Sequence, residues 1–451
     1  MTHIRFYRRW VGLACLALAT LTSPLVADEW PQWMGPTRDG EYRETGILER
    51  FPPAGPEVRW RHAIGGGYAG PAVAGGKVIV FDFQKRAGEA FNDPGKRAEL
   101  DGDERVVCLD EATGKVVWTH AYLCPYNISY PAGPRCTPTI SGSDVVTLGA
   151  EGDLKCLDLQ TGAVRWWVQL KKDLQAPVPI WGFSSHPLVT DDLVIITVGG
   201  PEQTVIAFDR QTGSVRWRAL SASAAGYCPP VLMEIGGITQ VVVFHADGLS
   251  GLSPADGEVY WSMPLKPAYE MAICRPQREG QWLYASGIGN QGVMFTLTDD
   301  PRVVQEAWVG TPKTGVYGGN VTPLFYNGVL YGADCGLGAL IAVDAKTGER
   351  LWQTFEATRQ GETRRISHGS AFITHLAMTD RYLLFSETGD LILARMTRAG
   401  YEEISRAHLL EATGEAFGRS VLWSHPAYAN RTAYLRNDRE IIAVSLAAEE
   451  R

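Results

Sequence analysis

Arginine, histidine and aromatic residues gather in the short segments just ahead of a regularly spaced set of prolines. Arginine presents a planar fork of N–H donors that fits carboxylates and phosphates, and aromatic rings offer faces for flat groups and cations. This combination predicts a binding site for a small anionic ligand or for a protein partner. The candidate residues are Tyr68, Arg135, Trp181, His186, Tyr227, Glu270, Arg275, Asn320, His368, Arg419, Trp423 and His425.

The common catalytic motifs do not support an enzyme. Gly287-Ile-Gly289-Asn-Gln-Gly292 matches the dinucleotide-binding pattern, but strand-forming residues flank it where that loop would open a helix. The sequence contains no GxSxG elbow, HExxH helix, P-loop or CxxCH haem site. Asp101-Gly-Asp103-Glu104 lacks the spaced ligands of a calcium-binding hand loop. We therefore predict no metal site and assign no catalytic residues.

A short pattern recurs along the chain: Asp, two residues, Thr-Gly, three residues, Trp. It begins at Asp110, Asp158, Asp209 and Asp344, and weaker copies at 253–257, 298–301 and 396–400 bring the number of turns to seven. Successive copies lie 44 to 51 residues apart, and the segments between them alternate like strands, without a helical period. This spacing is typical of a β-propeller with four-stranded blades.

A second column of the repeat is a proline that opens a short apolar strand. It occupies Pro71, Pro138, Pro187, Pro230, Pro276, Pro323 and Pro426, with Ala371 in the remaining place. These eight units exceed the seven turns, because the last unit, which ends in REIIAVSL, has no turn of its own. The isolated strand around Trp60 supplies the missing part. We therefore predict an all-β, eight-bladed β-propeller with four-stranded antiparallel blades, closed by the N-terminal strand.

The repeated turn has a structural explanation. Glycine accepts the positive φ of a hairpin, and the aspartate accepts hydrogen bonds from backbone N–H groups that follow it. The tryptophan is expected to fill the wedge between neighbouring blades. If these turns lie on one face of the disc, the linkers that carry the candidate residues meet at the channel mouth on the other face. The alternative interpretation is that those residues hold neighbouring blades together at a crowded axis.

The predicted boundaries are 1–27 for a signal peptide, 28–56 for an N-terminal clasp packed on the propeller, 57–446 for the propeller and 447–451 for a C-terminal tail. Within the first blade, the polar stretch 84–104 is predicted to be a surface loop.

The signal peptide prediction rests on three arginines at positions 5, 8 and 9, an apolar run from 10 to 21 and a small-residue exit at Ala27. The run is too short to span a bilayer, so we predict export to the periplasm or outside the cell, without a transmembrane span in the mature chain. Loss of those arginines from 42 basic residues leaves 39 against 50 acidic ones, a net charge of −11. No basic patch for nucleic acid is visible.

Removal of this leader also leaves seven of the eight cysteines. With an odd number, at least one thiol stays unpaired within a monomer. A disulfide between Cys124 and Cys136 is one option in an oxidising compartment, and buried free thiols are the other.

The repeated unit, as in CLDEATGKVVW and CLDLQTGAVRW, resembles the pyrroloquinoline-quinone (PQQ) type propeller repeat over nearly the whole predicted mature chain. WPQWMGPTRDG and FSETGDLILARMTRAGYEEISRAHLLEATGEAFGR resemble a group of exported PQQ-like propeller proteins of planctomycete-type bacteria. The resemblance implies either a quinoprotein dehydrogenase that uses PQQ and calcium, or a non-enzymatic propeller like the outer-membrane assembly lipoprotein BamB.

This sequence departs from the dehydrogenase pattern. Those enzymes usually carry two adjacent cysteines over the cofactor, and a calcium site of Glu, Asn and Asp. Here no cysteines are adjacent, and Glu270 and Asn320 have no obvious aspartate beside them. We therefore expect an exported, non-catalytic binding scaffold, for example in envelope biogenesis, with a PQQ-dependent alcohol or sugar dehydrogenase as the alternative. PQQ and calcium are expected only under that alternative.

Overall fold

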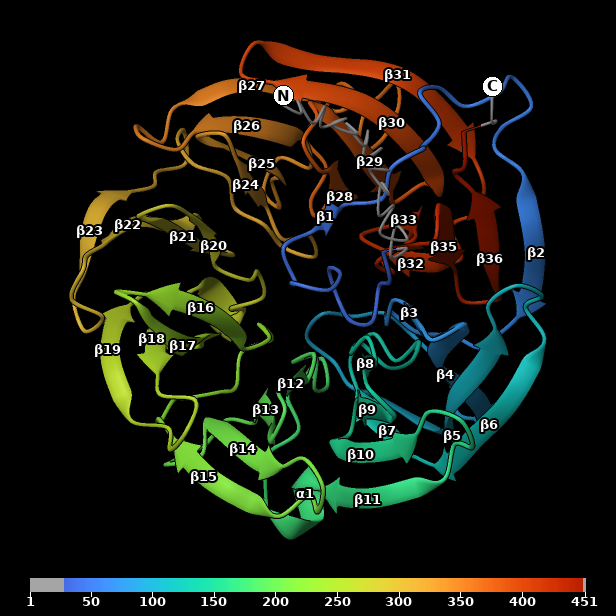
Figure 1. Cartoon of the computed structure of the whole chain (residues 1–451), viewed down its shortest axis with the longest axis vertical. Helices are drawn as coiled ribbons and strands as arrows, with labels where there is room; N and C mark the ends of the chain where they lie inside the picture. Colours follow the sequence, from blue (N-terminus) through green and yellow to red (C-terminus); the bar gives the residue numbers. More distant parts are fainter. Residues whose placement is uncertain (1–27, 449–451) are drawn as a thin grey trace, which may run out of the picture.

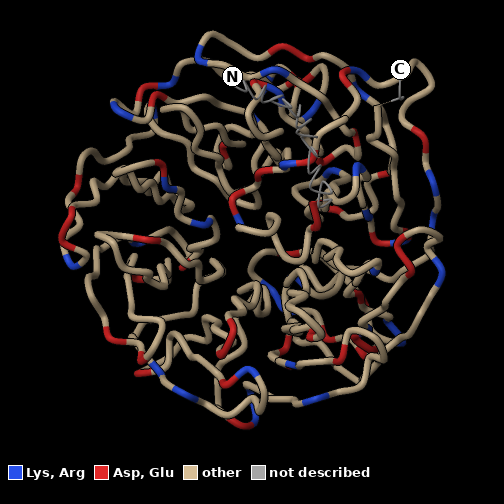
Figure 2. The backbone as a smooth tube through the Cα atoms, viewed as in Figure 1, with Lys and Arg blue, Asp and Glu red and all other residues tan. Residues whose placement is uncertain are grey.

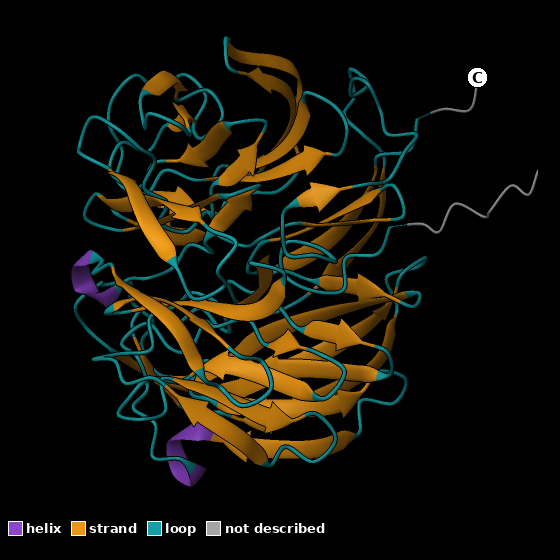
Figure 3. Cartoon of the chain, turned by 60° about the vertical axis from the view of Figure 1, so that its left-hand side comes forward, coloured by secondary structure: helices purple, strands orange, loops and turns teal. Residues whose placement is uncertain are grey.

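The strand–turn units of the chain close into a ring of eight four-stranded antiparallel blades in the computed structural model, which describes residues 28–448 (Figure 1). The predicted eight-bladed β-propeller is therefore confirmed. The side view in Figure 3 shows that strands dominate and that helical turns are few. The predicted signal peptide, at 1–27, lies outside the described residues.

The first four blades follow the chain in order, from the innermost strand of each blade to the outermost. Blade 1 contains β3 (Ala72–Ala74), β4 (Lys77–Ala87), β5 (Ala98–Asp110) and β6 (Val116–Leu123), with β7 (Tyr126–Ile128) paired to β5. Blade 2 contains β8 (Thr139–Ser141), β9 (Asp144–Leu148), β10 (Asp153–Asp158) and β11 (Val164–Gln169), followed by α1 (Leu170–Asp173). Blade 3 contains β12 (Leu188–Val189), β13 (Leu193–Thr197), β14 (Val205–Asp209) and β15 (Val215–Ala219). Blade 4 contains β16 (Val231–Ile235), β17 (Ile238–His245), β18 (Gly248–Leu252) and β19 (Val259–Pro264).

The last four blades complete the ring. The 3-10 turn η1 (Ala268–Glu270) leads into blade 5, with β20 (Gln277–Glu279), β21 (Trp282–Gly287), β22 (Gln291–Leu297) and β23 (Val304–Val309). Blade 6 contains β24 (Leu324–Tyr326), β25 (Val329–Ala333), β26 (Leu340–Asp344) and β27 (Arg350–Thr354). Blade 7 contains β28 (Ala371–Leu376), β29 (Arg381–Ser386), β30 (Asp390–Thr397) and β31 (Gly400–His408), followed by the hairpin of β32 (Gly414–Ala416) and β33 (Arg419–Val421). Blade 8 joins β34 (Ala427–Ala429), β35 (Thr432–Arg436) and β36 (Glu440–Ser445) to the N-terminal β2 (Val58–Ala63).

The closure of the ring agrees with the sequence prediction. Strand β2 pairs antiparallel with β36, so that Trp60 lies opposite Ala443. Because this pairing joins the two ends of the propeller, it leaves no blade incomplete and restrains every blade from both sides.

The repeated turn connects the third and fourth strands of its blade and has the predicted hydrogen bonds. The backbone N–H of Thr113 donates to Asp110 Oδ1 at 2.9 Å and its hydroxyl donates to the same oxygen at 2.6 Å. Gly114 has a φ of +67°. A Cβ at Gly162 in the next turn would lie 2.5 Å from the Trp118 ring, because this tryptophan packs directly on it.

Each of these tryptophans also ties its blade to the next one. The indole Nε1 of Trp118 in blade 1 donates to the Leu159 carbonyl of blade 2 at 2.9 Å. The same bond to the following blade is made by Trp60, Trp166, Trp217, Trp308 and Trp352. Trp261 differs, since it donates to the side chain of Gln240 in its own blade. The wedge role predicted for the tryptophan is therefore confirmed in most blades.

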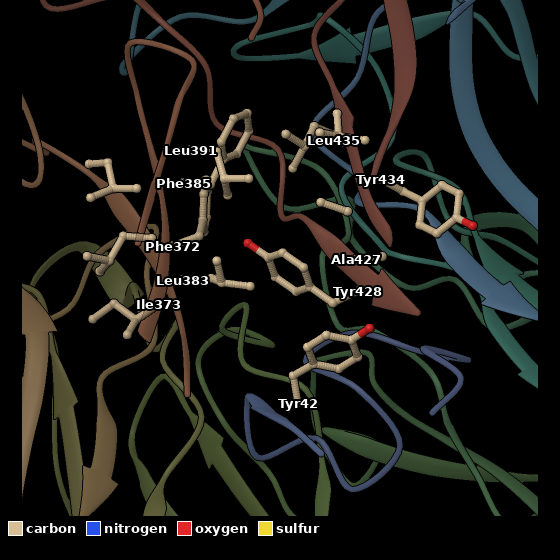
Figure 4. Packing of buried hydrophobic residues seen from close by; sticks show 14 of the residues in the cluster. Tyr42, Phe372, Ile373, Leu383, Phe385, Leu391, Ala427, Tyr428, Tyr434 and Leu435 are labelled. Atoms are coloured by element: carbon tan, nitrogen blue, oxygen red, sulfur yellow. The ribbon is translucent and has the colours of Figure 1, made fainter. Parts of the chain in front are cut away.

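The segment 28–56 runs into the middle of the ring (Figure 1). Strand β1 (Glu41–Tyr42) pairs in parallel with β28, the innermost strand of blade 7. Tyr42 is fully buried, with its ring centroid 5.8 Å from that of Tyr428 on blade 8, and Figure 4 shows the two rings side by side. The backbone of Asp28 and the side chain of Glu29 bond to the turns between first and second strands in blades 8 and 1. The segment thus enters the channel from the face that carries the repeated turns.

One prediction for blade 1 is right only in part. Residues 88–97 form an exposed loop, but the rest of the stretch 84–104 is strand, because β4 continues to Ala87 and β5 begins at Ala98. Glu104 is fully buried, and its carboxylate accepts hydrogen bonds from the hydroxyls of Tyr122 and Tyr126 and from the N–H of Ala150. Partners from other segments therefore satisfy a side chain that looks solvent-exposed in the sequence.

Acidic and basic residues are interspersed around the ring (Figure 2). Within residues 28–448, no helix has both the length and the apolar character needed to cross a membrane.

All seven cysteines of residues 28–448 are buried free thiols. Cys124 and Cys136 are among them, so these two form no disulfide in this structure.

Candidate functional site

The face opposite the repeated turns holds a cavity of about 720 Å³ at the mouth of the channel. Linkers that enter the first strand of each blade form its walls, because these linkers meet around the propeller axis. Nine of the twelve predicted site residues line it: Tyr68, Arg135, Trp181, His186, Tyr227, Asn320, His368, Trp423 and His425.

Three predicted residues do not line the cavity. Glu270 is exposed at the end of η1. Arg275 is buried in the linker before β20. Arg419, on β33, directs its guanidinium to the buried carboxylate of Glu387, with Nε–Oε1 at 2.8 Å and Nη2–Oε2 at 3.1 Å. This ion pair anchors the β32–β33 hairpin to blade 7.

Several aromatic and apolar residues of the cavity were not predicted from the sequence. Tyr269, 78% exposed, and Phe417, 48% exposed, stand at the rim. Tyr130 and Met271 contribute further wall surface, and Trp33 lines the cavity from the N-terminal segment. Aromatic residues in the linkers, which lie outside the repeat pattern, were the available signal for the rim. No comparable signal placed Trp33 inside the channel.

Trp33 lies between two histidines and forms the floor of the cavity. Its ring stacks on His186 with centroids 4.7 Å apart and planes at 11°, and it meets His425 edge-on at 5.7 Å. The indole Nε1 donates to His425 Nε2 at 3.2 Å, and Thr137 N–H donates to His186 Nδ1 at 2.8 Å. Each imidazole therefore accepts a hydrogen bond, which requires an unprotonated nitrogen.

Burial keeps the cavity histidines neutral at ordinary pH. It lowers the pKa of His425 to about 3, and it lowers the pKa of His186 well below its usual range, helped by nearby positive charge. The pKa of His368 falls to about 4, first through burial and then through the charge of Arg419. Desolvation disfavours the charged form of an imidazole. These three rings thus present flat, uncharged surfaces to a ligand.

His368 takes part in an aromatic cluster at the rim. Its ring stacks on Phe417 with centroids 4.9 Å apart and planes at 6°. Trp423 lies 6.4 Å from both rings and 6.2 Å from Tyr130. The backbone of His368 has a φ of +57°, which a non-glycine residue adopts only when surrounding contacts hold it there.

Arg135, the arginine in the cavity wall, is already engaged by the protein. Its guanidinium donates to the carbonyls of Trp181 and Ser129 at 2.8 Å each, to that of Tyr130 at 2.6 Å and to that of Gly133. The guanidinium also lies 5.1 Å from the ring centroid of Tyr68. Arg135 therefore braces the linkers, and few of its donors remain for a ligand.

Two donors in the cavity wall do lack partners among the described residues. The side-chain nitrogens Asn320 Nδ2 and Trp423 Nε1 are buried and make no hydrogen bond. A buried donor without an acceptor costs free energy, and because both nitrogens are covered, a shift of the wall must expose them before a ligand oxygen can accept their hydrogen bonds.

The residues that line the cavity include no aspartate or glutamate. One group of potential metal ligands, Glu104, Cys124 and Asp153, comes together within residues 28–448, and these residues do not line the cavity. The carboxylate of Glu104 already accepts hydrogen bonds from the hydroxyls of Tyr122 and Tyr126. The cavity is thus aromatic, uncharged apart from Arg135, and without the carboxylates that hard cations need.

Comparisons with known proteins agree with this architecture. A family model described as outer membrane protein assembly factor BamB matches residues 102–287. The curated quinohemoprotein alcohol dehydrogenase ADH-IIG of Pseudomonas putida is 27% identical over 135 residues, which are 28% of this chain and 18% of that protein. The match therefore spans less than one fifth of that relative's length.

Two solved structures share the fold at low sequence identity. BamB from Moraxella catarrhalis has a TM-score of 0.52 and 15% identity, over 82% of this chain and 99% of that chain. Quinohemoprotein alcohol dehydrogenase from Comamonas testosteroni has a TM-score of 0.58 and 13% identity, over 94% and 81%. The repeat motif, the eight four-stranded blades and the family match over residues 102–287 together support a PQQ-like β-propeller repeat architecture for this chain.

Proposed function

We propose that the protein is an exported, non-catalytic binding scaffold that docks an uncharged, protruding segment of a partner protein in the aromatic cavity. The observation that carries this proposal is the composition of the cavity wall, which combines tryptophan, tyrosine, phenylalanine and methionine with no aspartate, glutamate or lysine. The centres of protein–protein interfaces show the same enrichment in aromatic residues, Met and Arg and the same loss of Lys, Asp and Glu.

The polar groups of the cavity support a peptide segment as the occupant. Asn320 Nδ2 and Trp423 Nε1 lack acceptors, and backbone carbonyls of an inserted loop would supply them once the wall shifts to expose the two nitrogens. The exposed rings of Tyr269 and Phe417 at the rim provide the first contact surface for apolar side chains. The fold shared with BamB, whose family is described as an assembly factor, is consistent with a protein partner.

A small anionic ligand, the other prediction from the sequence, finds less support in the cavity. Arg135 donates to four backbone carbonyls, and the three histidines that line the cavity are neutral at ordinary pH. An anion placed there would lose its hydration without a free cation to replace it.

The dehydrogenase alternative meets the same difficulty. PQQ carries several carboxylates, and calcium takes six to eight oxygen ligands that include carboxylates in most protein sites. The cavity wall offers no carboxylate, and its arginine is occupied by carbonyls. The residues present therefore do not fit PQQ and calcium, and we derive no redox step.

The proposal is tested with a phage-displayed library of constrained peptide loops selected on the purified chain. We expect the selected loops to be rich in apolar residues and poor in charge. Trp423→Ala and Trp181→Ala should each weaken their binding by about 2 kcal/mol, or roughly 30-fold in Kd. Met378→Ala is the matched control, because Met378 is 94% exposed between β28 and β29, away from the cavity, and should leave Kd unchanged.

Two outcomes would contradict the proposal. One is a set of selected loops whose affinity is the same for the wild type and for both tryptophan variants. The other is stoichiometric binding of PQQ in the presence of calcium, seen in the cofactor absorbance, with dye-coupled oxidation of an alcohol or sugar. The second result would establish the dehydrogenase instead.

A further inference from the structure

Two other buried arginines show how this fold normally satisfies an arginine. Arg436 is fully buried and donates to backbone carbonyls, among them those of Phe81 and Gly65 at 2.8 Å each. Arg38, 3% exposed, donates to the carbonyls of Pro230 at 3.1 Å, His186 at 3.3 Å and Pro187. A buried guanidinium is tolerated here because carbonyl oxygens surround it.

Arg275 is buried in the same region but has no such partners. It is 9% exposed, and Nε is buried without any hydrogen-bond partner. Its backbone N–H donates to Thr322 Oγ1 at 3.2 Å. Among residues 28–448, no side chain or carbonyl forms an ion pair or hydrogen bond with its guanidinium. Arginine is almost never buried unless it is paired, so we expect the guanidinium of Arg275 to bind a group that is absent from the described residues.

The place of Arg275 in the repeat puts it at the axis. It directly precedes the proline that opens blade 5, as His186 and His425 do in blades 3 and 8. Those two histidines line the cavity above the Trp33 floor, whereas Arg275 does not line it. Arg275 instead interacts electrostatically with Arg38 and Asp39 of the N-terminal segment. Its side chain therefore lies with that segment, apart from the cavity wall.

The charges around Arg275 do not balance. Burial, followed by the charge of Arg275, lowers the pKa of Arg38 to about 9, which still leaves it cationic at neutral pH. The carboxylate of Asp39 is already bonded to the Thr37 hydroxyl at 2.6 Å and to Arg43 at 2.6 Å. Burial raises the pKa of the nearby Cys228 thiol to about 12, so it carries no negative charge. Arg38 and Arg275 thus have one nearby carboxylate, that of Asp39, which already bonds to Thr37 and Arg43.

From this arrangement we propose that a small inorganic anion, of the chloride type, binds the guanidinium of Arg275. The anion would accept hydrogen bonds from the unused N–H groups of Arg275, and its negative charge would compensate a buried positive charge. A water molecule could satisfy the donors but could not offset the charge. The inference is independent of the partner segment, because Arg275 is not part of the cavity wall.

Bromide is the probe for this site, because its anomalous scattering locates it directly. Crystals of the wild-type chain are soaked in sodium bromide at a concentration on the order of 0.1 M. We expect an anomalous peak within hydrogen-bonding distance of the Arg275 guanidinium. Ordered water at that position, with no bromide peak, would overturn the proposal.

A solution measurement uses the same anion chemistry. A ligand that binds only the folded state raises the midpoint of thermal unfolding. We expect a higher midpoint in sodium chloride than in sodium gluconate at equal ionic strength, and loss of this difference in Arg275→Met. Arg218→Met is the control, because Arg218 is an exposed arginine on β15 and should keep the difference. Equal midpoints of the wild type in both salts, or a difference that persists in Arg275→Met, would contradict the site.

Discussion

The two faces of the disc are built from different kinds of residues. On the face of the repeated turns, the same Asp, Thr, Gly and Trp recur and make the same hydrogen bonds in successive blades. On the cavity face, each linker contributes a different side chain, such as Trp181, Asn320 or Trp423. Repetition serves the structure that every blade needs, whereas variation among the linkers marks the face where one specific site is assembled.

The largest expected effect separates the two faces by stability. Trp118→Ala removes a ring from the wedge between blades 1 and 2, together with its bond to Leu159, and should lower the free energy of unfolding by about 3–5 kcal/mol. Trp423→Ala should cost far less stability, because its indole Nε1 has no partner to lose. Urea denaturation of both variants measures the difference. Equal losses would break the division between the faces.

A smaller effect is expected on the stability of the turn face at acidic pH. Hydrogen bonds first from Arg165 and then from Thr161 lower the pKa of Asp158 to about 2. A lowered folded-state pKa contributes stability above the unfolded value of about 3.9, and that contribution is lost as the pH falls toward 2. Asp158→Asn should therefore flatten the loss of stability between these pH values. Denaturant midpoints at pH 5, 4 and 3 test this, with exposed Asp191→Asn as control. If the denaturant midpoints of the wild type and of Asp158→Asn changed identically with pH, the hydrogen bonds to Asp158 would not stabilise the turn as described.

The smallest effect is expected on the cavity face, where binding should hardly change with pH. His368 and His425 have pKa values of about 4 and 3 because they are buried, so both stay neutral from pH 5 to 8. The Kd of a selected loop, measured by calorimetry across this range, should stay constant. A change in affinity centred near pH 6.5, the usual value for histidine, would show that a cavity histidine titrates and would refute the uncharged surface.

The turn face could be predicted from the sequence because its interactions are local. Asp110 and Thr113 lie three residues apart, and the bond between them depends only on the turn. The closing strand was also predictable, since Trp60 lacked a turn and the last unit lacked a strand. In both cases a pattern within a few residues, or a count of patterns, carries the information.

The cavity face was predicted only in part. The position of Arg135 beside the channel was foreseen, but its use as a brace for four carbonyls depends on loop geometry that no spacing reveals. Trp33 reaches the floor because the N-terminal segment enters the channel, a tertiary event. Glu104 was misplaced for the same reason, since hydroxyls from β6 and β7 allow its burial.

The most direct test of the division between the faces is amide hydrogen exchange on the chain with and without a selected loop. Our account predicts slower exchange in the linkers at 180–186 and 226–228 and in the β32–β33 hairpin, because these segments surround the cavity. Exchange in the repeated turns at 110–114 and 158–162 should stay the same. Protection confined to those turns, with none in the linkers, would place the binding surface on the opposite face and contradict the account.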